Sequence, residues 1–436
     1  MAYDIILGRD SSDKEKFGDK GIIYLGKGYV KMGQYTSLSN KIWMDVARSH
    51  VILVAGKRGS GKSYSISVIA EELSNLPPEN AKNIASLVFD TMGIFWTMKY
   101  KNEKDHTLLK EWNLEPKNLP VKVFIPFGKS AYYQEKNIPF DSTFSLKASE
   151  LEAEDWLDAF NLDFTSPLGV LIERSVSELK ENFPSFNVQD IISSIENDQK
   201  SGQENKNAVS AFFKAAESWG IFSKSREGTE VKDLLTAGTT TILDTSVYSS
   251  IGVFNIRALI ISLISRKIFK SRLDARKREE LQAIQHGQDY LSYSGKREEP
   301  LVWIFIDEAQ EFLPREGSTP ATQALMQLLR EGRQPGISLV LATQQPGQIH
   351  KDVMTQADIV LAHRVTAKPD IEALNEIMQT YLLENIRQQM DSLPSLKGSA
   401  IILDDNSERI YSMKVRPKFT WHGGEAPTSI KAEIKL

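Results

Sequence analysis

Short apolar runs recur along the chain, and most of them end in a polar side chain. They are VILVA at 51–55, ASLVFD at 85–90, TTTILD at 239–244, LVWIFID at 301–307, GISLVLATQ at 336–344 and DIVLAHRV at 358–365. Short, β-branched runs of this kind are typical of buried strands in a parallel sheet. Segments with helical spacing lie between them, so we expect an α/β fold whose sheet is mainly parallel.

Residues 146–230 break this alternation. Segments such as SLKASELEAEDWLDAF and NVQDIISSIENDQK place apolar residues at i, i+3 and i+4, and proline and polar turns separate them. This pattern predicts a helical insertion in the sheet domain.

Composition narrows the class of protein. The chain has 436 residues, of which 41% are hydrophobic and 25% charged, as expected of a globular protein with two to three domains or one large domain with insertions. We expect no membrane span, no secretory signal and a cytoplasmic protein. Cysteine is absent, which excludes disulfides and thiolate zinc sites. Proteins that coat nucleic acid are usually basic, whereas this chain has a net charge of −4. Any contact with nucleic acid must therefore be confined to a local surface.

A phosphate-binding motif follows the first apolar run. GKRGSGKS at 56–63 matches G-x-x-x-x-G-K-[ST] at every fixed position. Its glycines let the backbone curl around oxygens, and the amides at a helix N-terminus favour phosphate. Lys62 adds a full charge, and the Ser63 hydroxyl is a ligand for Mg²⁺. The alternative is a glycine-rich turn that binds nothing. The candidate nucleotide-binding residues are Gly56, Arg58, Gly59, Ser60, Gly61, Lys62, Ser63 and Tyr64.

The run at 301–306 ends in two acids, Asp307 and Glu308. Acids at the carboxyl end of a buried strand lie where ligands bind in open α/β sheets. We expect Asp307 to hold Mg²⁺ with Ser63, and Glu308 to polarise the attacking water. The alternative is that both carboxylates cap the next helix. If the strand ending at Gln344 lies beside this one, Gln344 reaches the γ-phosphate or the water as a sensor. The predicted fold is a RecA-like P-loop ATPase core.

Several stretches together resemble the HerA/FtsK group of ring-shaped DNA-pumping ATPases, and HerA-like ATPases most closely. They are SHVILVAGKRGSGKS, LVFDTMGIF, LLTAGTTTILDTS, WIFIDEAQEFLP, LREGRQPGISLVLATQQP, DIVLAHRVTAKPDIEAL and LPSLKGSAIIL. They occur in the order of the family, between residue 49 and about residue 403. The P-loop alone is generic, whereas DEAQEFLP followed by EGRQPGISLVLATQQP is much more specific.

The resemblance implies a homohexameric ring with DNA in its channel, ATP between subunits and a C-terminal arm that embraces the neighbour. The alternative for this C-terminal segment is a flexible, solvated end. The resemblance divides the chain into a short N-terminal β region, or reduced barrel (1–48), a first core part (49–145), the helical insertion (146–230), a second core part (231–416) and the arm (417–436). Two departures stand out. Too few residues precede the P-loop for the usual barrel, and the family's Gln-Arg-Pro is Gln344-Gln345-Pro346 here, which removes a cation.

A neighbouring subunit often supplies an arginine to such a site. The family's EGR pattern favours Arg330 and Arg333, with Arg364 as a further candidate. The alternative for Arg330 and Arg333 is that cations at a helix C-terminus offset its dipole.

The most basic stretch, RKIFKSRLDARKREE at 266–280, precedes a polar segment that contains Tyr290 and Tyr293. Here we weigh contact with DNA phosphates and bases against a solvated helix with a disordered connection.

The leading functional hypothesis is an ATP-driven DNA translocase or helicase. By resemblance it works with a nuclease such as NurA in DNA-end processing, or with effector proteins in antiviral defence. A second hypothesis is a nucleotide-gated scaffold that regulates such a partner without processive movement. A DEAH-box-like helicase is a third, but it needs two RecA-like halves, and the sequence shows one set of core strands.

Overall fold

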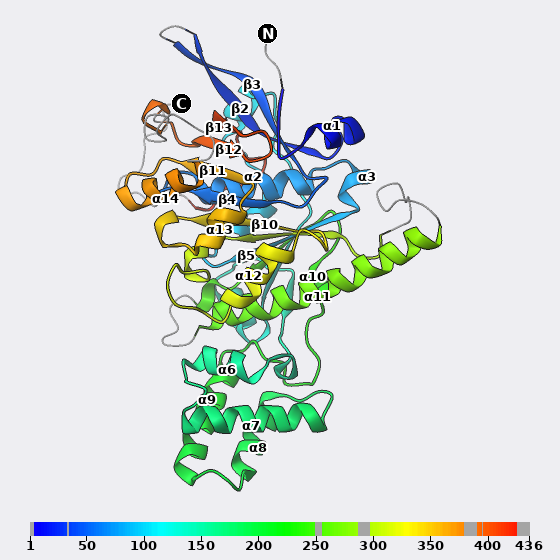
Figure 1. Cartoon of the computed structure of the whole chain (residues 1–436), viewed down its shortest axis with the longest axis vertical. Coiled ribbons are helices and arrows are strands. Elements are labelled where there is room, and N and C mark those ends of the chain that lie inside the picture. Colours follow the sequence, from blue (N-terminus) through cyan, green and yellow to red (C-terminus); the bar gives the residue numbers. More distant parts are fainter. Residues whose placement is uncertain are drawn as a thin grey trace.

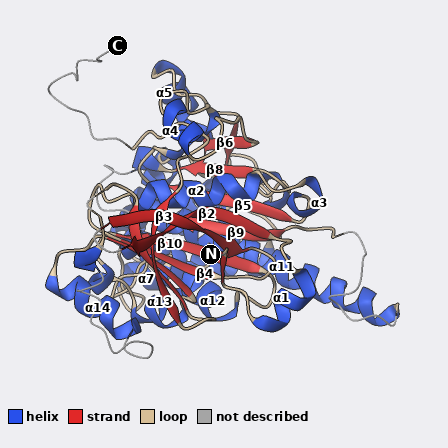
Figure 2. Cartoon of the chain, turned by 90° about the horizontal axis from the view of Figure 1, so that it is seen from above, coloured by secondary structure: helices blue, strands red, loops and turns tan. Residues whose placement is uncertain are grey.

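The computed structural model describes residues 4–32, 35–248, 255–286, 297–378, 390–394 and 396–424. One sheet of thirteen strands runs through these residues in the order β1-β3-β2-β13-β12-β11-β4-β10-β9-β5-β8-β6-β7. Helices cover both faces of the sheet (Figure 1, Figure 2). The prediction of an α/β fold with a mainly parallel sheet is confirmed.

Most strands are short, apart from β2 and β3, and the central strands β4, β5, β10 and β11 are wholly buried. Their bounds are β1 (Ile5–Leu7), β2 (Ile22–Met32), β3 (Tyr35–Asp45), β4 (Val51–Ala55), β5 (Ile84–Asp90), β6 (Val121–Pro126), β7 (Ser142–Phe144), β8 (Thr240–Asp244), β9 (Leu301–Ile306), β10 (Ile337–Thr343), β11 (Ile359–His363), β12 (Ser399–Asp404) and β13 (Arg409–Val415).

All neighbouring strands from β11 through β4, β10, β9, β5, β8 and β6 to β7 pair in parallel. Because these strands run in the same direction, the carboxyl ends of β4, β10, β9, β5 and β8 lie at one edge of the sheet. The candidate phosphate loop and both candidate acids follow strands of this set.

The N-terminal strands extend the central sheet. β2 and β3 form an antiparallel hairpin, β1 pairs in parallel with β3, and β2 pairs with β13. The expectation of a reduced barrel over 1–48 is therefore wrong for the described residues. The reason is the free edge of β13, whose backbone groups are satisfied by β2, so that the hairpin continues the sheet and does not close on itself.

The helices are α1 (Ser11–Phe17), α2 (Lys62–Ser74), α3 (Pro78–Ala81), α4 (His106–Glu111), α5 (Ser130–Glu135), α6 (Ala153–Phe160), α7 (Pro167–Asn182), α8 (Val188–Asn197), α9 (Gln203–Ser218), α10 (Val231–Leu234), α11 (Ile256–Gln285), α12 (Thr322–Glu331), α13 (Lys351–Gln356) and α14 (Lys368–Met378). Short 3₁₀ turns include η1 (Phe95–Lys99). No helix in the described part of the chain combines the length and apolar character that a membrane span requires.

Two hydrophobic cores lie on opposite faces of the sheet. Along β4, Ile52 and Val54 pack with the apolar side of α2, whereas Val51, Leu53 and Ala55 belong to the core that includes α11 and α12. This split follows from the strand geometry, because successive side chains point to opposite faces. A strand buried on both sides accounts for the unbroken apolar run VILVA.

Helices α6 to α9 lie together at the end of the molecule away from the N-terminal hairpin (Figure 1). Their centre is aromatic: Trp156 lies 4.9 Å from both Phe213 and Phe222, measured between ring centroids. Trp156 and Phe213 are fully buried. These helices thus carry apolar packing of their own, continuous with the core under the sheet.

Candidate nucleotide site

The phosphate loop leaves β4 at the carboxyl edge of the sheet and enters α2 at Lys62. Gly59 and Gly61 have φ angles of 74° and 117°, which side chains with a Cβ rarely adopt. The buried Oγ of Ser60 makes no hydrogen bond to any group in the described part of the chain. A buried hydroxyl without a partner, beside the first amides of a helix, fits an anionic ligand at this loop.

His363, at the end of β11, packs against the phosphate loop and the first turn of α2. Its Nε2 lies 2.9 Å from the hydroxyl of Ser65 on α2, and its Nδ1 lies 3.1 Å from the carbonyl oxygen of Ser399. Burial lowers the pKa of His363 to about 4, so the ring is neutral, donates through Nδ1 and accepts through Nε2. A Cβ at Gly56 would lie 2.7 Å from that of His363, so this close approach requires glycine.

Ser63 and Asp307 meet across the sheet edge. The Ser63 hydroxyl donates a hydrogen bond of 2.6 Å to Oδ2 of Asp307. Asp307 is buried, and the loss of water raises its pKa, while Ser63 and Lys62 oppose that rise. One hydroxyl and one carboxylate are the oxygen ligands with which a protein holds Mg²⁺ beside nucleotide phosphates. The donor set therefore fits that ion.

Lys62 is buried in the same place. Its Nζ donates to the carbonyl oxygen of Lys57 over 3.3 Å, and only 5% of the residue is exposed. Burial lowers the pKa of Lys62, and Asp307 and Glu308 act in the opposite direction. A desolvated ammonium gains more from a phosphate than one in water, because the local dielectric is low.

Glu308 adopts an unusual backbone conformation with φ of 53°, in the left-handed region. Its side chain accepts hydrogen bonds from the amides of Gln344 and of Gln310, the latter over 2.8 Å. The carbonyl oxygen of the Gln310 amide in turn accepts from the Thr343 hydroxyl over 2.8 Å. This network fixes the carboxylate of Glu308 between the ends of β9 and β10, and strained backbones of this kind gather at functional sites.

Comparison with known proteins identifies the family of this chain. A family model described as "Helicase HerA, central domain" matches residues 30–268, more than half of the 436 residues. The chain belongs to the HerA helicase family. A second family model, "Zonular occludens toxin (Zot)", matches residues 254–369.

Two archaeal relatives illustrate the similarity. The DNA double-strand break repair helicase HerA of Pyrococcus furiosus is 26% identical over 165 residues, which cover 35% of this chain and 27% of that protein. A probable helicase of Methanocaldococcus jannaschii is 23% identical over 390 residues, which cover 87% of this chain and 65% of that protein. The chain thus spans less than two-thirds of the length of these relatives. Membership of this family supports an NTPase.

Solved structures agree on the fold. VirB4 of Thermoanaerobacter pseudethanolicus superposes with a TM-score of 0.54 at 10% identity, over 92% of this chain and 98% of that one. The bacterial conjugative coupling protein TrwB superposes with a TM-score of 0.50 at 12% identity, over 95% and 94%. These similarities support the P-loop ATPase fold of this HerA-family chain.

The three candidate arginines lie in different places. Arg330 donates to Asp352 over 3.0 Å and 2.6 Å, and Arg333 lies 3.5 Å from Oδ1 of Asp358. Both are near the amino ends of the parallel strands, at the edge opposite the phosphate loop. Arg364 instead lies beside its own loop, since its carbonyl oxygen accepts from the amide of Lys57 over 3.2 Å. Arg330 and Arg333 therefore do not reach Lys62 of their own chain, and a role for them requires a neighbour.

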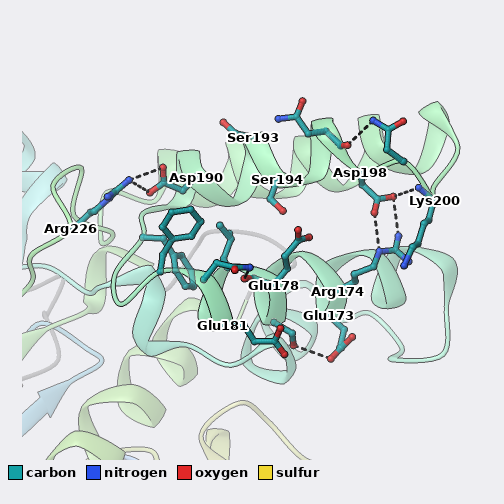
Figure 3. A pocket seen from close by; sticks show the side chains of 17 residues that line it. Glu173, Arg174, Glu178, Glu181, Asp190, Ser193, Ser194, Asp198, Lys200 and Arg226 are labelled. Atoms are coloured by element: carbon teal, nitrogen blue, oxygen red, sulfur yellow. Dashed lines mark hydrogen bonds and ion pairs between the residues drawn. The ribbon is translucent and has the colours of Figure 1, made fainter.

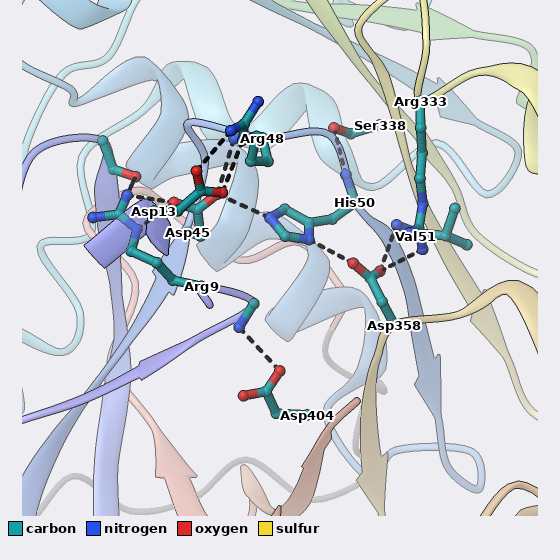
Figure 4. A network of polar contacts seen from close by, with 12 residues as sticks. Arg9, Asp13, Asp45, Arg48, His50, Val51, Arg333, Ser338, Asp358 and Asp404 are labelled. Carbon is teal, nitrogen blue, oxygen red and sulfur yellow. Dashed lines mark hydrogen bonds and ion pairs between the residues drawn. The ribbon is translucent and has the colours of Figure 1, made fainter. Parts of the chain in front are cut away.

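A buried histidine that no sequence pattern singles out shares Asp358 with Arg333. His50 Nδ1 lies 2.6 Å from Asp358, and Nε2 lies 3.1 Å from Asp45, which is paired with Arg9 (Figure 4). Burial alone would lower the pKa of His50, but hydrogen bonds to Asp358 and Asp45 raise it to about 9. A charged His50 thus links the N-terminal hairpin to the core.

Two further acids end strands at the same edge as Asp307. Asp90 on β5 lies opposite Asp244 on β8 in the sheet register. Burial and the charge of Asp244 raise the pKa of Asp90 to about 7. The carboxylate of Asp90 accepts hydrogen bonds from the amides of residues 92–95. Its geometry is that of a turn-stabilising residue next to the site.

The C-terminal segment does not behave as a free arm. We define the strap as residues 416–424. Within it Phe419 and Thr420 donate backbone N–H groups to the buried carboxylate of Glu71 on α2, over 3.0 Å and 2.9 Å. Arg416 pairs with the same carboxylate at 3.1 Å. Residues 417–424 thus pack on their own chain and supply donors to Glu71, and the expectation that 417–436 embraces a neighbour stays a prediction. Residues 425–436 lie outside the described residues.

The basic stretch at 266–280 forms part of α11, and several of its cations face acids of the same chain. Arg266 pairs with Asp155 at 2.6 Å and Lys267 with Glu150 at 3.0 Å. Arg272 is buried and donates to the carbonyl oxygens of Pro335 and Glu299. These contacts favour a structural role for this stretch over contact with DNA. Tyr290 and Tyr293 lie outside the described residues.

A groove of about 820 Å³ lies between α7 and α8 (Figure 3). These helices are remote from β4 and α2, which flank the phosphate loop (Figure 1). Both arginines of the groove are paired within it: Arg174 with Asp198 at 2.9 Å, and Arg226 with Asp190 at 3.2 Å. Neither the phosphate loop nor the acids Asp307 and Glu308 line this groove.

Proposed function

We propose that the chain is an ATP- and Mg²⁺-dependent motor that moves DNA through a ring of identical subunits. The observation that carries this proposal is the meeting of Ser63, Asp307 and the Glu308–Gln344 pair at one sheet edge of a HerA-family chain. These residues follow three adjacent strands and, together with the loop at 56–63, provide the groups that phosphoryl transfer to water needs from one subunit.

In the proposed site the phosphates lie on the loop at 56–63, and Lys62 balances their charge. Ser63 and Asp307 hold Mg²⁺, which would shield the phosphate oxygens. Glu308 orients and polarises the attacking water, and Gln344 reports the presence of the γ-phosphate through its hydrogen bond to Glu308. Tyr64 and Arg58 flank the nucleotide.

The proposed ring is a homohexamer in which Arg330 or Arg333 of one subunit completes the site of the next. Their position at the edge opposite the phosphate loop supports this, because a head-to-tail ring brings opposite surfaces of neighbouring subunits together. The departure at Gln345 is compatible with a neighbour supplying the missing cation.

DNA is the proposed substrate, and a NurA-like nuclease or a defence effector the proposed partner. The name of the Pyrococcus relative, a DNA double-strand break repair helicase, supports a role in DNA-end processing. A cytoplasmic location follows from that role. With a net charge of −4, the chain would contact DNA through a local surface and with little sequence specificity.

The pairing of the cations of α11 with acids keeps a second function open, a nucleotide-gated scaffold that assembles a partner without moving DNA. One experiment separates the two. ATP hydrolysis and strand displacement are measured with and without blunt and tailed DNA, alongside the mass of the particle. A motor is stimulated by DNA and displaces strands. An ATPase rate that DNA leaves unchanged, without strand displacement, favours the scaffold.

A further inference from the structure

A pocket of about 760 Å³ begins at the phosphate loop and continues away from it. One wall is the loop and the start of α2, a second is the segment from Ile94 to Trp112, a third is the strap, and residues 396–398 and 414–415 complete the lining. Residues from the first three walls include Ser63, Tyr64, Asn102, Trp112, Trp421 and His422. The volume lies within the range that suits a nucleotide-sized ligand.

The part of the pocket beyond the loop is rich in flat side chains. Tyr64 and His422 meet edge to face, with ring centroids 5.1 Å apart. Trp112 and Trp421 also line the pocket, and 40% of Trp421 is exposed. A tryptophan exposed to this degree beside a cavity offers a stacking surface that the rest of the described chain does not cover.

The wall that carries Trp421 is held at both ends. The carbonyl oxygen of Tyr100 accepts from the Trp421 amide over 2.7 Å, and the Thr97 hydroxyl accepts from the Gly423 amide over 3.1 Å. The Tyr64 hydroxyl oxygen accepts from the Lys418 amide over 2.7 Å, which ties the strap to the first turn of α2. The strap is thus fixed with respect to the phosphate loop.

The second wall joins the strap through a buried amide. Asn102, 2% exposed, donates from Nδ2 to the carbonyl oxygen of Lys418 over 3.0 Å and to Asp105 over 3.1 Å. These two hydrogen bonds hold the shape of this wall. The pocket therefore offers a ligand aromatic faces at one end and phosphate-binding amides at the other, and the cations Arg58, Lys104, Lys397 and Lys414 also line it.

We propose that this pocket binds the base and ribose of the nucleotide, and that the strap completes it in cis, with Trp421 stacking on a purine ring. The proposal rests on nucleotide binding at the phosphate loop as set out above. It assigns base recognition to the chain's own C-terminal segment and not to a neighbouring subunit. Base stacking on an aromatic side chain contributes enough to be measured by its removal.

The test compares two ligands that share their phosphates and differ in the base. Affinities of the full chain for Mg·AMPPNP and Mg·tripolyphosphate are measured by calorimetry, for the natural chain and for Trp421→Ala. We expect the variant to bind AMPPNP roughly tenfold more weakly and tripolyphosphate unchanged, because only AMPPNP has a base to stack. Trp421→Phe, which keeps an aromatic face, should restore most of the lost affinity.

Tyr132→Ala is the control, since this exposed aromatic on α5 neither contacts the strap nor lines the pocket. It should leave both affinities unchanged. Equal AMPPNP binding by Trp421→Ala and the natural chain overturns the base site, as does an equal loss for both ligands, which would mean a general disturbance of the loop. Lys62→Ala should bind neither ligand. If the natural chain also binds neither, nucleotide binding at the phosphate loop is overturned.

Discussion

The hydroxyl of Ser63 donates a 2.6 Å hydrogen bond to Asp307, although the two residues lie 244 positions apart. They meet because β4 and β9 both pair in parallel with β10, which brings the ends of the three strands to one edge. The long intervening sequence is accommodated as strands at the side of the sheet and as the helices α6 to α9. The insertion thus leaves the geometry between these two residues intact.

Replacement of Asp307 tests the proposed metal site. Asp307→Asn keeps the size of the side chain and removes its charge, so it should bind nucleotide yet lower the turnover of ATP at saturating Mg²⁺ by at least about a hundredfold. Turnover is measured as phosphate release across a Mg²⁺ titration. Glu316→Gln, at an exposed acid, serves as the control and should behave like the natural chain. Near-normal turnover in Asp307→Asn would remove this residue from metal binding.

Glu308→Gln should retain ATP but hydrolyse it about 10²- to 10⁴-fold more slowly, because the amide cannot polarise water. Gln344→Ala should lower turnover by roughly tenfold, since Glu308 loses the donor that fixes its orientation. Single-turnover hydrolysis separates these effects from nucleotide binding. Gln327→Ala, at an exposed position on α12, is the control. If Gln344→Ala matched the natural rate, the proposed sensor would lose its basis.

Local patterns were sufficient to predict the parallel strands, the phosphate loop and the two acids. VILVA and LVWIFI are buried on both faces, and such runs are recognisable without any knowledge of their neighbours. The order of the sheet was not recognisable, because strand pairing depends on residues hundreds of positions apart. The hairpin at 22–45 therefore was expected to form a reduced barrel, whereas it pairs with β13.

Buried charges were also invisible in the sequence. Glu71 lies on α2 among polar residues that look like a solvated face, yet it is fully buried under the strap. Arg272 lies in the most basic stretch of the chain and is buried as well. In both cases a distant segment supplies the hydrogen-bonding groups, and nothing in the local sequence indicates which segment that is.

His50 should make stability depend on pH in the alkaline range. Its pKa is about 9 in the folded chain and about 6.5 when unfolded, because Asp358 and Asp45 stabilise the charged ring. The folded state therefore binds the extra proton more tightly. Its contribution, on the order of 2–3 kcal/mol, is complete below about pH 6.5 and is lost as the pH rises through about 9.

Urea midpoints measured between about pH 6 and about pH 9.5 test this dependence. His50→Gln should unfold at lower urea at the acid end of this range and lose most of the alkaline decline. His106→Gln, at an exposed histidine, should keep the decline of the natural chain. A decline that persists unchanged in His50→Gln would assign it to other groups.

Arg333 offers the sharpest test of a shared site. In the single chain it faces Asp358 at the edge opposite the phosphate loop, so direct contact with a nucleotide requires a neighbouring subunit. We expect Arg333→Ala and Glu308→Gln each to be inactive alone and to regain activity when mixed. At equal amounts about a quarter of the interfaces combine an intact Glu308 with an intact Arg333, so about a quarter of the natural ATPase rate should return.

Lys62→Ala mixed with Glu308→Gln is the control, because both lesions lie in one subunit's half of the site and no interface is repaired. Full activity of Arg333→Ala alone would dismiss the arginine, and recovery in the control mixture would show that subunits do not share sites in this way.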